Sequence, residues 1–348
     1  MEVYERISDL RTAVRVGRND GKTIGFVPTM GALHAGHASL IDAARAQCGF
    51  VVVSIFVNPT QFGPAEDLSR YPRTPQQDLR MCLDHGADAI FMPPVDEMYP
   101  GVSRASCPRV TRASRSRMSV DVATQIASET CNSGTRASDN LSTDSAVSPA
   151  IDPGVLTLTE VSIRKLGEHL CGASRPGHFT GVCTVVAKLF NIVQPDNAFF
   201  GAKDFQQATI LRQMAADLNF PLEVVVCPTL READGLAMSS RNTYLTPEFR
   251  RQAPALHHAL QMARRMILDG RPPAGTVAQA IQNQIARMAP SGQIDYVQIV
   301  DLATLAPVDA TDAGVCIALA VKFGSTRLID NIVIEMEPSA GSDQPAAQ

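Results

Sequence analysis

Residues 28–37 read PTMGALHAGH and stand between a short apolar run and a stretch with helical spacing. The run before them, residues 22–28 (KTIGFVP), and a second one at residues 50–57 (FVVVSIFV) have the apolar, β-branched character of strands that are buried on both faces. Between the two runs, residues 34–48 place apolar side chains every three or four positions. Strand, helix and strand in this order predict a right-handed βαβ unit of a doubly wound parallel sheet.

The segments that follow extend this unit into a larger α/β pattern. A helix is expected over residues 74–85 and a strand over residues 88–92. The alternation resumes later, with helices expected at residues 160–170, 182–193 and 205–218 and strands at residues 198–200 and 222–227. The predicted fold class is therefore α/β, with a Rossmann-like doubly wound parallel sheet.

After Pro247 the order of the expected elements changes. Two amphipathic helices are expected there, over residues 248–268 and 276–288, followed by strands at residues 294–300, 314–323 and 326–329. Helices followed by antiparallel strands are typical of a small α+β unit. We therefore expect a Rossmann-like domain over residues 1–231, a C-terminal lid domain over residues 232–337 and a disordered tail over residues 338–348.

Residues 103–153 interrupt the pattern, because they are rich in Ser, Thr, Ala and Arg and hold few large apolar side chains. Such a composition cannot bury enough apolar surface to offset the entropy of ordering a chain. We predict a disordered insertion that is passive in the chemistry. The alternative is a functional arm, since its early arginines are interleaved with serines and could bind an acidic partner or respond to phosphorylation.

The composition argues against several classes of function. The chain has 348 residues, of which 45% are apolar, and its formal net charge of -4 argues against a nucleic-acid-binding surface. No apolar run reaches the roughly 18 residues of a membrane-spanning helix, and the N-terminus MEVYERISDL lacks the apolar core of a secretory signal. The eight cysteines are scattered without a CxxC pair, which predicts a reduced cytoplasmic protein.

His34 and His37 lie three residues apart at the expected start of a helix, so they share one face beside free backbone N–H groups. Imidazoles in that position can donate hydrogen bonds to phosphate oxygens and to charge that develops in a transition state. Gly31 and Gly36 would let a ligand approach the backbone closely. Two surface histidines on an ordinary helix are the alternative, but the preceding strand and glycine turn favour a functional site.

Two further segments carry polar side chains suited to a small anion or a nucleotide. VNPTQF follows a strand, where ligands bind in open α/β sheets, and its Asn58 and Gln61 offer neutral donors and acceptors for a hydroxy acid. In FGAKDFQQ, Lys203 can neutralise phosphates, and Asp204 can hold Mg²⁺ directly or through water. An ordinary turn in the first segment and a helix N-cap at Asp204 are the alternatives.

The loop segment MSSRN, residues 238–242, combines two hydroxyl groups with Arg241. The guanidinium offers a fork of donors, so this loop could act as a mobile clamp on triphosphate oxygens. An ordinary polar loop is the alternative.

Taken together, these segments resemble the pantothenate synthetase family of the HxGH nucleotidyltransferase superfamily, over nearly the whole chain outside the insertion. The matching segments follow one order along the chain and are PTMGALHAGH, VVVSIFVNPTQF, EDLSRYPRT, GASRPGHFTGV, KLFNIVQPDNAFFGAKDFQQ, DGLAMSSRNTYLT and RLIDN. Several long segments in order are far more specific than HxGH alone. Two positions depart from the family pattern: Ala202 stands where Glu is usual, and Gln77 replaces an acidic residue beside Asp78.

The resemblance implies an ATP-dependent ligase that joins pantoate to β-alanine through a pantoyl adenylate. It implies catalytic roles for His37, the family's proposed proton donor, and for His34, Lys203 and Arg241. It also implies Mg²⁺ with ATP, with Asp78 and Asp204 as candidate metal ligands, and a cytoplasmic homodimer. The implied ATP site consists of Met30, Gly31, Ala32, Leu33, His34, Ala35, Gly36, His37, Gly201, Ala202, Lys203, Asp204, Leu230, Met238, Ser239, Ser240 and Arg241.

The same resemblance implies the residues that bind the other substrates. Gln61 and Gln207 correspond to the glutamines that bind pantoate, and Gln61 also faces the β-alanine position. Asn58, Arg175 and His178 are expected to line the same cleft. Two other interpretations stay open: a different HxGH nucleotidyltransferase or aminoacyl-tRNA synthetase fragment, and a nucleotide-binding regulator without turnover. The paired glutamines and the lack of a basic tRNA-binding region count against the first, and the intact catalytic candidates count against the second.

Overall fold

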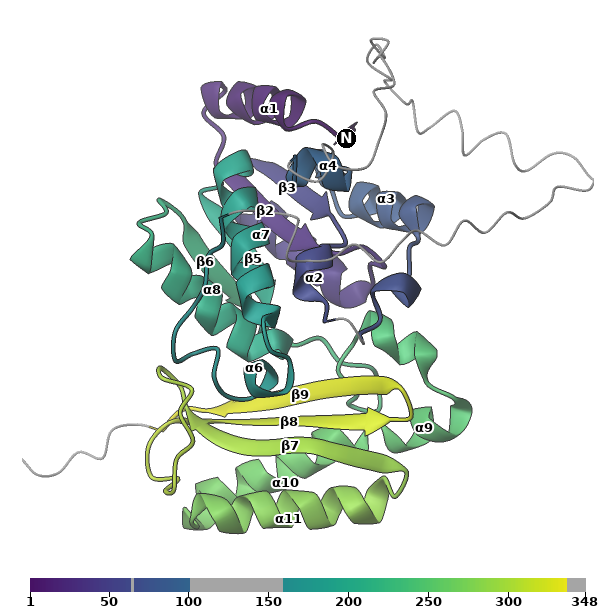
Figure 1. The fold of residues 1–348 in the computed structure, drawn as a ribbon, viewed down its shortest axis with the longest axis vertical. Helices are drawn as coiled ribbons and strands as arrows, with labels where there is room; N and C mark the ends of the chain where they lie inside the picture. Colours follow the sequence, from purple (N-terminus) through teal and green to yellow (C-terminus); the bar gives the residue numbers. More distant parts are fainter. Residues whose placement is uncertain (64–65, 101–158, 337–348) are drawn as a thin grey trace, which may run out of the picture.

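Six parallel strands form the central sheet of the N-terminal part of the molecule (Figure 1). The structure is a computed structural model and describes residues 1–63, 66–100 and 159–336. The strand order is β1-β4-β3-β2-β5-β6, and all neighbouring pairs are parallel, so the predicted Rossmann-like doubly wound sheet is confirmed. The strands are β1 (Glu2–Tyr4), β2 (Ile24–Thr29), β3 (Phe50–Ile55), β4 (Ala89–Phe91), β5 (Asn197–Gly201) and β6 (Glu223–Cys227).

Alternate side chains of these strands enter separate cores on the two faces of the sheet. In β3, Val52 belongs to one buried cluster, whereas Val51 and Val53 belong to another. This period of two explains why the strand is apolar except for Ser54, since both of its faces are covered. The first cluster is covered by α1 (Ile7–Asn19), α7 (His178–Val193) and α8 (Phe205–Asp217), and the second by α2 (Ala35–Gln47) and α3 (Pro75–Asp84).

The C-terminal part is a three-stranded antiparallel sheet that lies beyond the parallel sheet, with helices on its outer side (Figure 1). Its strand β8 alternates: Ile317 and Leu319 pack in a core with the outer helices, whereas Cys316 and Ala318 join the core of the parallel sheet. The expected α+β architecture of this part is confirmed. Its elements are α9 (Pro247–Gln252), α10 (Ala255–Gly270), α11 (Ala274–Met288), β7 (Gly292–Asp301), β8 (Val315–Phe323) and β9 (Thr326–Ile334).

The helix expected over residues 160–170 is wrong, because this segment is an irregular loop. Lys165 adopts a left-handed backbone conformation with a φ of 58°, which is incompatible with a continuing helix. A residue of another element binds this loop: the buried side chain of Gln206, in α8, donates to the carbonyls of Leu166 and His169 at 2.9 and 2.8 Å. The apolar spacing that suggested a helix is used instead to pack residues such as Leu166 into the main core.

Other boundaries differ by smaller amounts. The single helix expected over residues 248–268 is divided into α9 and α10 at Pro254, which has no N–H to continue the first helix. Helix α7 begins at His178, earlier than expected, and β9 continues to Ile334, beyond its expected end. The N-terminal elements β1 and α1 were not expected from the sequence.

Some expectations fall on residues that the structure does not describe. The insertion at residues 103–153 and the tail at residues 338–348 lie outside the described residues. Within the described ranges, six cysteines are buried free thiols, and no helix has the length and apolar character needed to cross a membrane. The domain boundary at residue 231 stays a prediction.

Candidate active site

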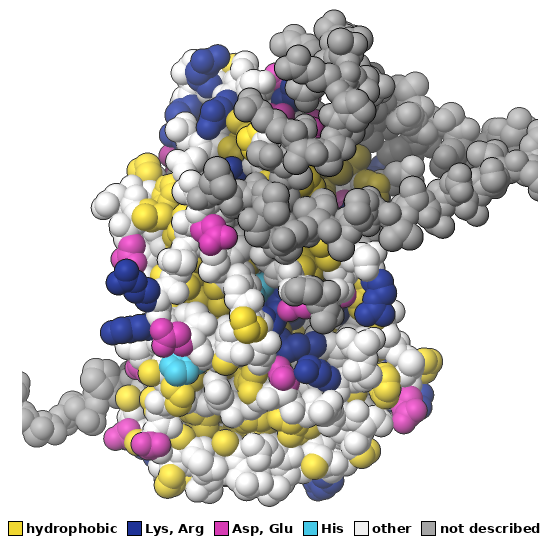
Figure 2. All heavy atoms as spheres, viewed as in Figure 1, with side chains coloured by type: hydrophobic (Ala, Val, Ile, Leu, Met, Phe, Trp, Pro, Cys, Tyr) yellow, Lys and Arg dark blue, Asp and Glu magenta, His cyan; other side chains and the backbone are white. Residues whose placement is uncertain are grey.

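Two adjoining cavities lie between the carboxyl end of the parallel sheet and the antiparallel sheet. Their volumes are about 230 Å³ and about 780 Å³, and the smaller one is lined by residues at the ends of β2 and β5. Figure 2 shows Lys and Arg side chains interspersed with Asp and Glu across the middle of one face, between the two parts of the molecule. Because both cavities share Lys203, Asp204, Gln207, Ser239 and Arg241, they form one continuous cleft.

The turn that follows β2 is held in shape by the buried carboxylate of Asp78. Gly31 and Ala32 both have left-handed backbones, with φ of 82° and 49°. Asp78 accepts hydrogen bonds from the N–H groups of Ala32 and Leu33 at 3.0 and 2.7 Å, and from the Thr74 hydroxyl at 3.0 Å. Its carboxylate lies outside the lining of both cavities. The structure therefore gives Asp78 the role of shaping the loop and gives no support to the expected metal contact.

Backbone N–H groups hold both histidines at the start of α2 in one tautomer. Nδ1 of His34 accepts from the N–H of Gly36 at 3.1 Å, and Nδ1 of His37 accepts from the N–H of His34 at 3.3 Å. Each neutral ring therefore carries its proton on Nε2, which is a donor. Desolvation is the main reason why the pKa of His34 is lowered to about 4 and the pKa of His37 to about 3, and Lys203 lowers both further. Both rings are thus neutral donors at pH 7.

Lys203 reaches the cleft from η5 (Ala202–Asp204), the turn between β5 and α8. Its Nζ lies 3.8 Å from the Asp204 carboxylate, and Asp204 is itself 47% exposed. The turn is fixed from the antiparallel sheet, because the Asn331 amide in β9 donates to the carbonyls of Ala202 and Lys203 at 3.0 and 2.8 Å. The cation is therefore presented by a backbone that both sheets hold in place.

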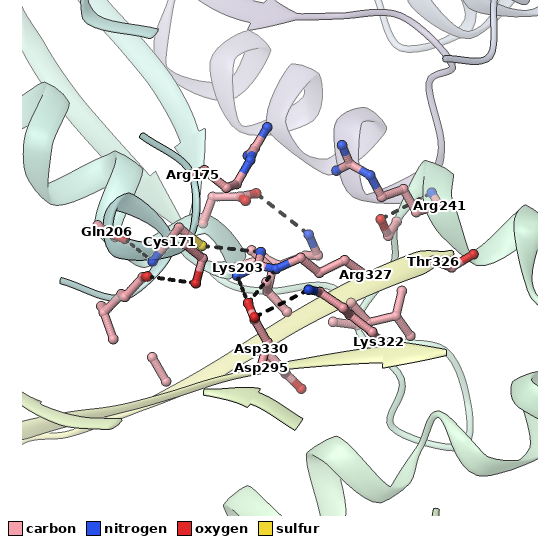
Figure 3. Close-up of a pocket in the computed structure, with 18 of the residues that line it drawn as sticks. Cys171, Arg175, Lys203, Gln206, Arg241, Asp295, Lys322, Thr326, Arg327 and Asp330 are labelled. Atoms are coloured by element: carbon pink, nitrogen blue, oxygen red, sulfur yellow. Dashed lines mark hydrogen bonds and ion pairs between the residues drawn. The ribbon is translucent and has the colours of Figure 1, made fainter. Parts of the chain in front are cut away.

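Arg241 lies on the opposite wall, in η6 (Ser240–Tyr244), and Figure 3 shows it facing the larger cavity together with Arg175 and Lys203. The Ser239 hydroxyl caps this turn by accepting from the Arg241 N–H at 3.3 Å. Nε and Nη2 of Arg241 donate to Asp67 at 3.2 and 3.3 Å. Among the described residues, its Nη1 has no hydrogen-bond partner, so that end remains open to a phosphate.

Asn58, which was expected to contact a substrate, is fully engaged within the protein. Its Oδ1 accepts from the hydroxyls of Tyr99 at 2.7 Å and Thr60 at 3.1 Å. Its Nδ2 donates to the carbonyl of Gly181 and to Oε1 of Gln61, both at 3.2 Å. A carboxamide has two donor and two acceptor positions, and all four are used. Asn58 therefore supports Gln61 and has no hydrogen bond left for a ligand.

Arg175 and His178 line the larger cavity, and both also contact the backbone carbonyl of Gln61. Arg175 pairs with Glu66 through Nε and Nη2, at 2.6 and 2.5 Å, and its Nη1 lies 3.0 Å from Nε2 of His178. Nδ1 of His178 meets the carbonyl of Gln61 at 2.9 Å. Since a carbonyl only accepts, Nδ1 carries the proton and Nε2 accepts from Arg175. Desolvation and then the Arg175 charge lower the pKa of His178 to about 4, which agrees with a neutral ring.

The structure brings most of the expected residues to the smaller cavity. Those that line it are Met30, His34, Gly36, His37, Asn58, Gln61, Gly201, Lys203, Asp204, Gln207, Leu230, Met238, Ser239, Ser240 and Arg241. The others of the expected ATP site lie off its lining and are Gly31, Ala32, Leu33, Ala35 and Ala202. Arg175 and His178 line the larger cavity.

The sequence did not indicate the apolar wall of the smaller cavity. Helix α7 supplies much of this wall through Val182, Val185, Val186 and Leu189, and Tyr71 lies beside them in the lining. The helix is apolar on nearly every side, because most of it is buried. Periodicity alone therefore could not tell which of its side chains face a ligand.

Comparison of the sequence with known proteins gives one consistent result. A family model described as pantoate-beta-alanine ligase matches residues 2–333. A pantothenate synthetase of Moorella thermoacetica is 45% identical over 336 residues, which cover 97% of this chain and 99% of that protein. A pantothenate synthetase of Acetivibrio thermocellus is 42% identical over 336 residues, which cover 97% of this chain and 100% of that protein.

Solved structures agree with the sequence comparison. Pantothenate synthetase from Thermus thermophilus has a TM-score of 0.76 at 37% identity, and the match covers 97% of this chain and 100% of that one. Pantoate-beta-alanine ligase from Francisella tularensis, complexed with beta-gamma ATP and β-alanine, has a TM-score of 0.66 at 28% identity. That match covers 96% of this chain and 97% of the other.

Proposed function

This chain belongs to the pantoate–β-alanine ligase family, and we propose that it condenses pantoate with β-alanine through a pantoyl adenylate, releasing AMP and pyrophosphate. The observation that carries the proposal is the convergence on one cleft of three segments whose side chains could donate to phosphate oxygens: the histidine pair of α2, Lys203 of η5 and Arg241 of η6. Gln61 and Gln207 line the same cleft beside them. Donors for a triphosphate and amides for a hydroxy acid thus occur within reach of one another.

In the first step, a carboxylate oxygen of pantoate attacks the α-phosphorus of ATP, and the bond to pyrophosphate breaks. No nucleophile from the protein is needed, so the contribution of the site is orientation and charge stabilisation. Neutral His34 and His37 offer Nε2–H donors to the phosphate oxygens. Lys203 and the open end of Arg241 would neutralise the negative charge that gathers on the departing pyrophosphate.

In the second step, the amine of β-alanine attacks the carbonyl carbon of the pantoyl adenylate. The new C–N bond forms, the C–O bond to AMP breaks with its electron pair leaving on the AMP phosphate, and the proton lost by the amine passes to solvent water. The Francisella tularensis protein, which was described in complex with β-alanine, supports the presence of a subsite for that substrate in this chain. Gln61 is the residue we assign to both the pantoate and the β-alanine positions.

Pantoate is favoured over other acids by the combination of amides and an apolar wall. The side chains of Val182, Val185 and Leu189 from α7 face the same cavity as the Gln61 amide. A branched hydroxy acid would bury its alkyl part against this wall and place its oxygens against the glutamines. A phosphate ester without a branched alkyl part would leave this wall without a matching partner.

Magnesium would enter with ATP as part of the substrate. Asp204 is the one carboxylate among the described residues that line the smaller cavity, and no described group of three acidic, His or Cys side chains is arranged to hold a metal. This donor set fits an ion held mainly by triphosphate oxygens, with Asp204 as a direct or water-mediated ligand. The ion would supply charge neutralisation on the phosphates.

We also propose a cytoplasmic homodimer, which is supported by the family resemblance and by the free thiols of the described cysteines. Analytical ultracentrifugation of the purified chain tests the oligomeric state. A monomer at micromolar concentration would contradict the dimer and leave the catalytic proposal standing.

The decisive experiment for the activity measures AMP formation with ATP, pantoate and β-alanine, and then omits each substrate in turn. We expect AMP release to require all three, and pyrophosphate release to require ATP and pantoate only. Pyrophosphate release that depends on an amino acid or a phosphate ester instead would favour a different HxGH nucleotidyltransferase. ATP binding without any turnover would favour a regulator.

A further inference from the structure

We propose that Tyr99 is a positioning residue for pantoate, because it fixes through Asn58 which end of the Gln61 amide faces the cleft. This inference rests on the proposed function. Tyr99 lies directly after α4 (Val95–Met98), is 1% exposed and lines neither cavity. It therefore cannot touch a substrate, and any effect on substrate binding must pass through the residues that it contacts.

The orientation of Asn58 follows from an acceptor that cannot donate. The carbonyl of Gly181 in α7 lies 3.2 Å from Nδ2 of Asn58, so this side of the amide must be the NH₂ group. Its Oδ1 then faces Tyr99 and Thr60, whose hydroxyls donate to it at 2.7 and 3.1 Å. Because Asn58 is 1% exposed, water cannot replace these donors readily.

The orientation of Gln61 follows from that of Asn58. The second N–H of Asn58 Nδ2 points to Oε1 of Gln61 at 3.2 Å, so the oxygen of the Gln61 amide faces the protein. The Nε2 end of Gln61 therefore faces Met30, at 2.8 Å from its sulfur, and both residues line the smaller cavity. A thioether is a weak acceptor, so a carboxylate or hydroxyl oxygen of pantoate would be a better partner for this donor.

The ring of Tyr99 also has packing contacts of its own, apart from the hydrogen bonds of its hydroxyl. It lies 6.2 Å from the ring of Phe56, which follows β3, and Lys188 of α7 lies over its face at 5.4 Å from the centroid. Removal of the hydroxyl alone should leave this packing in place. The Tyr99→Phe variant thus isolates the hydrogen bond to Asn58 from the fold of the loop.

The test compares Tyr99→Phe with wild type in steady-state assays in which pantoate and ATP are varied separately. With one donor lost, Asn58 can rotate toward alternatives that no longer orient Gln61, so the KM for pantoate should rise by about tenfold. The KM for ATP should change by less than about twofold. Tyr4→Phe is the matched control, because it removes a hydroxyl on the edge strand β1, away from both cavities. That control should leave both KM values unchanged.

A double-mutant cycle separates positioning from a general structural effect. In a Gln61→Ala background there is no amide left to orient, so Tyr99→Phe should no longer change the KM for pantoate. Persistence of the effect in that background would overturn the proposal, as would an unchanged pantoate KM in Tyr99→Phe. If Tyr99→Phe does not fold, Thr60→Val removes the other donor to the same oxygen and carries the same cycle.

The outcomes also distinguish this inference from the proposed function. A wild-type protein without pantoate-dependent AMP formation would overturn both. An active wild type with a kinetically normal Tyr99→Phe variant would overturn the positioning role alone.

Discussion

Asn331 of β9 donates its side-chain amide to the backbone carbonyl of Lys203 at 2.8 Å. The bond joins the antiparallel sheet to the turn that carries the cation of the cleft. The preceding residue, Asp330, has a 3% exposed side chain that pairs with Arg231 at 2.7 and 3.0 Å and so joins β9 to the segment that follows β6. The RLIDN segment, residues 327–331, thus fixes the position of a residue predicted to be catalytic.

Replacement of Asn331 by Ala should impair the use of ATP. The carbonyls of Ala202 and Lys203 would lose a buried donor, at a cost of about 1–3 kcal/mol, and η5 would be free to shift. We expect kcat/KM for ATP to fall by about tenfold or more while the oligomeric state and the circular dichroism spectrum of the wild type are retained. Asn283→Ala, on the exposed face of α11, is the matched control. Normal ATP kinetics in a folded Asn331→Ala protein would contradict the link between the sheets.

His37→Ala should lower kcat/KM by at least about 100-fold, the scale of losing one preorganised donor. The ring lies at the start of α2, with Nδ1 engaged by the His34 N–H and Nε2 as its donor. His85→Ala serves as the control, since His85 pairs with Asp42 away from the cleft. The fold should survive both changes, as measured by melting temperature. Turnover close to wild type in His37→Ala would remove the residue from the mechanism.

The lowered histidine pKa values predict how stability depends on pH. In the folded chain His34 and His37 have a pKa of about 4 and about 3, whereas an unfolded histidine titrates near 6.5. Between these values the unfolded chain binds protons that the folded chain does not, so the free energy of unfolding should fall as the pH drops from 7 toward 4. His37→Gln should reduce the proton uptake on unfolding by about one proton at pH 5. Urea unfolding at several pH values measures this, and an unchanged slope in the variant would contradict the neutral assignment.

Asp78→Asn should separate a structural role from a metal role. The variant would keep one acceptor for the loop but turn an N–H toward a backbone N–H, so the left-handed turn at Gly31 and Ala32 would lose support. We expect stability to fall by about 1–3 kcal/mol and turnover to drop. The Mg²⁺ concentration for half-maximal activity should stay the same. A rise of about tenfold in that concentration would mean that Asp78 binds the metal after all.

The parallel sheet could be predicted because several of its strands are short apolar runs that can be recognised from the local sequence alone. β2 and β3 are buried on both faces, so they are mainly apolar and carry only Thr29 and Ser54 as polar residues, and the segment between them carries the histidine pair. The apolar spacing of residues 160–170 likewise predicted a helix from the local sequence, but the structure shows an irregular loop there. Gln206, which is distant in the sequence, donates to the carbonyls of Leu166 and His169, and Lys165 beside them has a left-handed backbone conformation. Local periodicity contains no information about such partners.

The same limit applies to the site. Residue type and position after a strand were enough to indicate Gln61 and Lys203, which do line the cleft. Residue type and position could not show that all four hydrogen-bonding positions of the Asn58 amide are used within the protein. Nor could they show that Arg175 and His178 bind the backbone carbonyl of Gln61. A polar side chain near a ligand and one that positions its neighbour look alike in sequence, and only the donor and acceptor inventory separates them.

Gly181→Ala should weaken pantoate binding, although it replaces no polar side chain. A Cβ added at Gly181 would overlap the carbonyl oxygen and carbon of Thr60 and crowd the backbone of Gln61, all in η1 (Pro59–Gln61). Backbone atoms cannot rotate away as a side chain can, so α7 and η1 would have to separate. That movement would break the bond from Asn58 to the Gly181 carbonyl, on which the orientation of the Gln61 amide depends.

We therefore expect Gly181→Ala to raise the pantoate KM by more than about tenfold, beyond the effect of Tyr99→Phe, and to lower the melting temperature. Gly275→Ala in α11 is the matched control, because a Cβ there meets no atom within 4 Å. Alanine is the better helix former, so that control should be neutral or slightly stabilising. If Gly181→Ala bound pantoate normally, the contact between α7 and η1 would be loose enough to admit a methyl group. The Gln61 amide could then not be oriented through Gly181, because the carbonyl that sets Asn58 would itself be free to move.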